Sequence, residues 1–149
     1  MKYKRVIIFL IFVIICITGC ETTKIIEVSY NVKEIPNENF RVTINNYFKN
    51  FDDIRRWKEY STETFIKRAY SWCTGDYSED ATIDEMIEIY YELNKNSLRL
   101  KSIEINNIKV SDSDEILIEV TRTWENNQKD ESIYSLLLEN EEWKFDNRM

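Results

Sequence analysis

The spacing of the apolar residues changes once along the chain, near Leu98, and this change limits the folds that the chain can adopt. Before it, apolar residues recur every three or four positions, as on the buried face of a helix. The clearest set is Phe40, Ile44, Tyr47, Phe48 and Phe51. After it, apolar and polar residues alternate, as in strands with one buried face. Helices followed by an antiparallel meander favour an α+β fold.

The helical half predicts about three helices that pack on one face of a curved sheet. They cover residues 40–50 with a short continuation over 53–59, 62–72, and 83–94. Ser61 or Thr62 is expected to cap one of them, because a hydroxyl at this position accepts a hydrogen bond from the first turn. Thr82 and Glu85 have the spacing of a capping box at the start of the last helix.

The second half predicts four antiparallel strands, over residues 98–110, 116–124, 132–139 and 142–146. In the first of these, Asn106 and Asn107 separate apolar residues of opposite parity, which predicts a β-bulge. One domain is expected over residues 39–149, because the length suits a single core. Residues 20–38 hold the only proline and are predicted to be a tether. The alternative is a strand at a sheet edge, since Ile26, Val28, Tyr30 and Val32 alternate with polar residues.

The N-terminus has the pattern of an export signal. Residues 1–5 are basic, residues 6–17 form an unbroken apolar run, and small residues follow. The run is shorter than the about 20 apolar residues of a spanning helix. The segment that follows, Ile17-Thr18-Gly19-Cys20, resembles the lipobox of bacterial lipoproteins.

The lipobox resemblance implies that residues 1–19 are a signal peptide, cut between Gly19 and Cys20, and that the thiol of Cys20 carries a diacylglycerol. It also implies attachment to the outer, extracytoplasmic face of a cell membrane, with the membrane as a partner through Cys20. Two acyl chains make such attachment stable, at about 0.8 kcal/mol per buried CH₂. The alternative is an ordinary signal peptide or an uncleaved anchor, in which the cysteine has no role.

Residues 39–147 carry a second resemblance. Their helices, their long strands and the closing segment 137–145 are similar to the nuclear-transport-factor-2-like family, also called SnoaL-like or cystatin-like. The resemblance implies a cone of helices and curved sheet. In family enzymes this cone holds an Asp–Tyr or Asp–His pair. The chain departs from the pattern in its last turn, where Asn140 stands in place of the usual glycine.

Composition excludes several functions. The formal net charge is −7, and after residue 19 there are 27 acidic against 17 basic residues, because Lys2, Lys4 and Arg5 lie before it. Such a surface repels phosphate backbones, so no nucleic-acid partner is expected. The chain has no histidine, which removes the commonest general base and zinc ligand. No cofactor and no metal are expected.

Aromatic residues are the main candidates for a site. Five are expected to line a cavity if the cone is hollow, namely Trp57, Tyr70, Tyr90, Trp124 and Trp143. The alternative, which helical spacing favours, is that they fill the core. The acidic clusters fall in predicted turns and helix starts, where carboxylates have an ordinary structural role, so no catalytic residue is assigned.

These observations predict a non-enzymatic, lipid-anchored domain that binds a partner protein or a small ligand at the cell envelope. The alternative is a SnoaL-like isomerase or hydrolase that uses a carboxylate–tyrosine pair in the cone.

The anchor is tested directly by mass spectrometry of the native protein. We expect a mature N-terminus at Cys20 with a diacylglycerol on its thiol, and release or failed processing in Cys20→Ala. The matched control is Cys16→Ala, which lies inside the predicted signal and is expected to leave processing unchanged. An unmodified Cys20, or a mature N-terminus at any other residue, contradicts the prediction.

Overall fold

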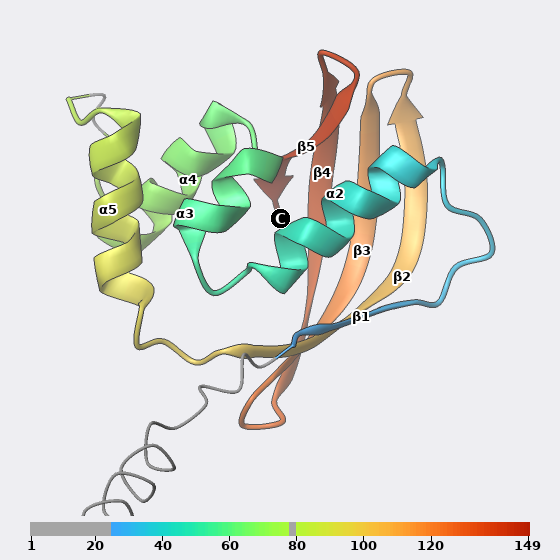
Figure 1. Ribbon diagram of the computed structural model, residues 1–149, viewed down its shortest axis with the longest axis horizontal. Coiled ribbons are helices and arrows are strands. Elements are labelled where there is room, and N and C mark those ends of the chain that lie inside the picture. The colour runs from blue at the N-terminus through green and yellow to red at the C-terminus, as the bar shows by residue number, and fades with distance from the viewer. Residues whose placement is uncertain (1–24, 78–79) are drawn as a thin grey trace, which may run out of the picture.

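The computed structural model describes residues 25–77 and 80–149, and it confirms the α+β class (Figure 1). Its four helices are α2 (Glu38–Lys49), α3 (Ile54–Trp57), α4 (Glu63–Thr74) and α5 (Ile83–Asn94), with a 3₁₀ turn, η1, at Lys58–Tyr60. Its five strands are β1 (Glu27–Tyr30), β2 (Leu100–Asp112), β3 (Glu115–Trp124), β4 (Lys129–Glu139) and β5 (Glu142–Arg148). They form one open sheet in the order β1-β2-β3-β4-β5.

The sheet is mixed and five-stranded, so the prediction of four antiparallel strands was wrong. β2 to β5 form the predicted antiparallel meander, but β1 adds a parallel strand beside β2, with Val28 opposite Ile103. The alternation noted in the predicted tether is this strand, and its half-buried Val28 and Tyr30 pack against the core. The Tyr30 hydroxyl also donates to Asn45 Oδ1 at 3.1 Å, which ties β1 to α2.

The helix count also differs from the prediction, because the segment after α2 is a separate element. Asp53 caps α3 by accepting from the Arg55 N–H, and the chain then tightens into η1. The predicted caps are confirmed at Thr62, which accepts from the Phe65 N–H, and in the capping box of Thr82 and Glu85.

Two irregularities in the sheet bear on side-chain direction. The predicted bulge in β2 is confirmed by a shift of register between Ile105 and Asn107. A second shift lies in β5, where Phe145 pairs with Leu136 and Asn147 pairs with Ser135. Asp146 is thus the extra residue, and it reverses the parity of the residues that follow it.

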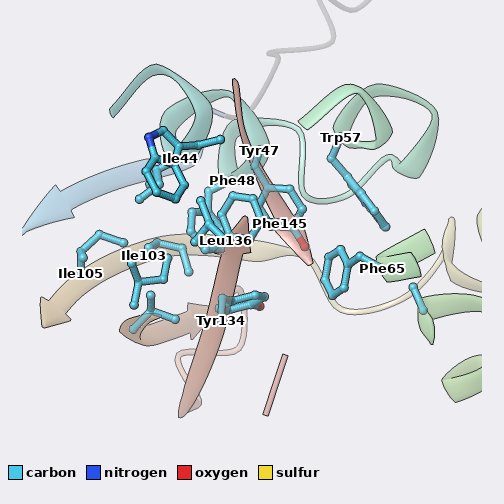
Figure 2. Close-up of a cluster of buried hydrophobic side chains, with 14 of the residues drawn as sticks. Ile44, Tyr47, Phe48, Trp57, Phe65, Ile103, Ile105, Tyr134, Leu136 and Phe145 are labelled. Atoms are coloured by element: carbon cyan, nitrogen blue, oxygen red, sulfur yellow. The ribbon is translucent and has the colours of Figure 1, made fainter. Parts of the chain in front are cut away.

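The core lies between α2 and the sheet. Figure 2 shows Tyr47 and Phe48 of α2 gathered with Phe145, with Trp57 and Phe65 to one side. The rings of Tyr47 and Phe145 stack at 3.8 Å. Trp143 packs edge-on against Phe40 of the same helix instead, at 5.9 Å.

No helix among residues 25–77 and 80–149 is long and apolar enough to cross a membrane. The predicted signal peptide, the lipobox and Cys20 all lie outside the described residues.

The Phe145 side chain is the test of this core. Because it is fully buried among Tyr47, Phe48 and Tyr134, Phe145→Ala should cost about 3–5 kcal/mol of unfolding free energy, measured by urea denaturation of residues 21–149. The control is Leu138→Ala, which is 38% exposed on the neighbouring strand and should cost less than about 1 kcal/mol. Equal losses in the two variants would show that the closing strand does not pack as described.

Candidate ligand pocket

A pocket of about 840 Å³ lies where α3, α4 and α5 meet the sheet. Figure 1 shows these three helices grouped beside one end of the sheet, with the C-terminal end of β5 between them and α2. The end of α2, the connection from α5 to β2, and the ends of β3 and β5 complete the lining. The pocket therefore joins segments from both halves of the sequence.

Three of the five aromatic residues expected at a cavity line this pocket, namely Trp57, Tyr90 and Trp124. Trp57 is buried, and Tyr90 stands edge-on to it at 5.9 Å. The other aromatic residues of the lining are Tyr47, Phe51, Phe65, Trp72 and Tyr91. The walls are thus aromatic on the α2, α4, α5 and β3 sides.

Tyr70 and Trp143 do not line the pocket. The Tyr70 hydroxyl donates to Asp76 Oδ2 at 3.0 Å, in the loop after α4. Trp143 is buried against Phe40, which lies near the start of α2. Both side chains have the structural role that was the alternative for them.

One polar group of the lining is the Tyr47 hydroxyl. Tyr47 is only 2% exposed, yet its hydroxyl makes no hydrogen bond to any residue in the part of the chain that is described. Burial raises the pKa of this phenol well above its ordinary value. Burial also raises the pKa of Tyr90, to about 12. Both phenols are neutral at physiological pH and face the pocket as hydrogen-bonding groups.

An arginine network on the sheet holds Trp124, which lines the pocket. Arg122 is buried and donates through Nε and Nη2 to both oxygens of Asp130, at 2.6 and 3.0 Å, and through Nη1 to the Tyr134 hydroxyl at 3.2 Å. The Trp124 indole N–H donates to Asp130 Oδ2 at 3.0 Å and so fixes the ring at the pocket wall. Partial burial raises the Asp130 pKa, but the hydrogen bonds from Arg122 and Trp124 outweigh this and hold it below its ordinary value.

A second arginine, Arg148, lies at the end of β5. The Asp146 bulge places it opposite Tyr134, on the inner face of the sheet, and it lines the pocket half-buried. Its guanidinium carbon lies 4.9 Å from the centre of the Trp72 ring, a cation–π contact. Arg122 has a salt bridge, but Arg148 forms none with any carboxylate among residues 25–77 and 80–149.

The rim of the pocket is basic. Lys49, Arg56, Lys95 and Arg99 are exposed around it, against two carboxylates, Asp52 and Asp53. The Asp53 carboxylate is already bound to Arg55, whose hydrogen bonds lower the Asp53 pKa. The pocket thus has an excess of positive charge in a protein whose formal net charge is −7.

A smaller hollow of about 540 Å³ lies over α5, and its lining is acidic. It holds Asp76, Asp80, Glu85 and Glu88, beside Ala81 and Ile89. Within the described ranges no three acidic or cysteine side chains gather closely enough to hold a metal ion. We therefore place the candidate site in the larger pocket.

The sequence contained a signal for one of the two arginines. Arg122 occupies the inward parity of β3, in line with Ile116, Ile118 and Val120. A charged residue at an inward position usually has a fixed partner. Arg148 had no such signal, because the bulge that turns it inward is not visible in the sequence.

Comparison with known protein families and with curated proteins finds no match to this chain.

The Arg122–Asp130 pair yields a stability prediction. Asp130→Asn leaves a buried guanidinium without its counter-charge, so it should cost about 1–3 kcal/mol near neutral pH, measured by urea denaturation. Because the folded-state pKa of Asp130 lies below its unfolded value of about 3.9, the contribution of this carboxylate is complete above that value and is lost as the pH falls below it. The difference in unfolding free energy between wild type and Asp130→Asn should therefore become smaller below about pH 4. Asp114→Asn, in an exposed turn, is the control and should change stability by less than about 0.5 kcal/mol.

Proposed function

We propose that this protein is a lipid-anchored extracytoplasmic domain that binds a small ligand without chemical change. The observation that carries the ligand site is the pocket of about 840 Å³ between α3–α5 and the sheet, which has aromatic walls and a few convergent polar groups. Pockets of this size and composition are typical of small-molecule sites. The pocket favours a small ligand over a partner protein, which needs a broad surface.

The anchor in this proposal rests on the sequence alone. The lipobox-like segment Ile17-Thr18-Gly19-Cys20 directly follows an apolar run of export-signal length. β1 begins at Glu27, only a few residues after Cys20, so a lipid on that cysteine would hold the domain close to the membrane surface. The ligand would then be bound at the cell envelope.

Binding is favoured over catalysis by the carboxyl groups. A carboxylate–tyrosine enzyme needs an acid whose pKa is raised by the site. The pKa values of Asp53, Glu85 and Asp130 are all lowered, because hydrogen-bond donors stabilise each carboxylate. The contact between Tyr70 and Asp76 is a carboxylate–tyrosine pair, but Tyr70 does not line the larger pocket. The SnoaL-like enzyme remains the second candidate, because its fold class agrees with the observed one.

The four tryptophans provide the test. We label residues 21–149 with fluorotryptophan and screen a library of small fragments by fluorine NMR. Bound fragments should shift the resonances of Trp57, Trp72 and Trp124, which line the pocket.

Trp143 is the internal control for this screen, because it is 7% exposed and packs away from the pocket. A library in which no fragment shifts the three pocket resonances, or shifts all four equally, contradicts the proposed site. Conversion of a fragment into a product, followed in the same spectra, would favour the enzyme.

A further inference from the structure

We infer that the pocket binds a small carboxylate with a flat apolar body, and that Arg148 and Tyr47 hold the carboxylate. This inference rests on the proposed function and names the class of ligand. It stands on four observations in the described part of the chain: the state of Arg148, the state of the Tyr47 hydroxyl, the walls, and the charge of the rim.

Arg148 is a cation that donates a hydrogen bond to the Tyr134 hydroxyl and that stabilises the Asp130 carboxylate from beyond salt-bridge distance. It is half-buried among aromatic rings, 4.9 Å from the centre of the Trp72 ring, and forms no salt bridge with a carboxylate of the described residues. Removing a charge from water without a partner is unfavourable, and buried charges in proteins are normally paired. Arg122, one strand away from Tyr134, shows the usual arrangement with Asp130. An anion in the pocket would form the same kind of ion pair with Arg148.

The Tyr47 hydroxyl is the second donor. It belongs to a residue that is 2% exposed and that lines the pocket, and it hydrogen-bonds to no described residue. Both groups lie beside Tyr134: the rings of Tyr47 and Tyr134 are 6.2 Å apart, and Arg148 is the partner of Tyr134 in the sheet. A guanidinium presents parallel N–H donors that match the two oxygens of a carboxylate. A neutral phenol adds a third donor to the same anion.

The walls select the body of the ligand. Trp57, Tyr90, Trp72 and Trp124 offer ring faces and edges, and these pack best against flat apolar groups. The polar groups concentrate on one side, where β5 ends, so the apolar part of a bound molecule would lie toward α4 and α5. A volume of about 840 Å³ leaves room for a fused-ring body.

The rim adds attraction over a longer range. Lys49, Arg56, Lys95 and Arg99 outnumber Asp52 and Asp53 around the mouth, although Arg56 and Lys95 are in salt bridges with Asp53 and Glu92. The rest of the surface is acidic, so an anion is repelled elsewhere and drawn to this mouth.

The test compares naphthoate with naphthylmethanol, its neutral analogue of nearly the same shape. The full-length chain is placed in phosphatidylcholine nanodiscs, and binding is measured by titration calorimetry with empty nanodiscs subtracted. We expect naphthoate to bind at least tenfold more tightly than naphthylmethanol, and added salt to reduce this ratio.

Three variants assign the donors. Arg148→Gln should weaken naphthoate binding at least tenfold and change naphthylmethanol binding by no more than about twofold. Tyr47→Phe should weaken naphthoate binding about fivefold, and it should likewise leave naphthylmethanol binding nearly unchanged. Arg41→Gln is the matched control, because this arginine is exposed over the Tyr30 ring at 5.4 Å, away from the pocket, and it should change neither constant.

The possible outcomes separate the two proposals. If neither compound binds and neither shifts the pocket tryptophans, the ligand site itself is wrong. If both bind equally, or if Arg148→Gln weakens both equally, the pocket binds small molecules but the assignment of a carboxylate to Arg148 is wrong. The comparison of the two compounds on the unaltered chain decides the class of ligand even if a variant fails to fold.

Discussion

The ring of Tyr47 holds the two halves of this fold together. It lies against six other aromatic rings, which come from α2 and the turn after it, α3, α4, β4 and β5: Phe48, Phe51, Trp57, Phe65, Tyr134 and Phe145. The stack with Phe145 at 3.8 Å fixes α2 on the sheet, and the contacts with Trp57 and Phe65 fix the helices beside it. The same residue also lines the pocket. Packing and site therefore depend on one side chain.

The two arginines on the inner face of the sheet reach it in different ways. Arg122 follows the regular alternation of β3, and Asp130 of the paired strand neutralises it directly. Arg148 reaches the inner face only because Asp146 bulges out of β5. Bulges commonly re-aim a side chain at a site, and here the re-aimed side chain lines the pocket and forms no salt bridge with a described carboxylate.

The period of the sequence predicted the fold class, the meander, the helix caps and the bulge in β2, because each depends on residues close together in the chain. Two features depended on contacts that local pattern does not encode. β1 joined the sheet because Val28 and Tyr30 found a partner in β2, some 70 residues later. Trp72 and Arg148 both line the pocket but lie far apart in the sequence. They meet because the bulge at Asp146 turns Arg148 to the inner face of the sheet. Tyr70 and Trp143 are aromatic like the wall residues, but they lie elsewhere. Tyr70 bonds to Asp76 in the loop after α4, and Trp143 lies on the inner face of β5 beside Phe40, near the start of α2.

Partial burial of the Arg148 guanidinium has an energetic cost for the folded state. A half-buried guanidinium loses part of its hydration. The Trp72 ring, the Tyr134 hydroxyl and the more distant Asp130 carboxylate offset part of this cost, but no salt bridge with a described carboxylate is formed. The chain has 27 acidic residues and uses one of them to neutralise Arg122, so acidic residues are not scarce. Natural proteins keep such unfavourable features mainly at functional sites. A ligand that supplies the missing charge stabilises the folded state through its own binding energy, which couples occupancy of the pocket to stability of the domain.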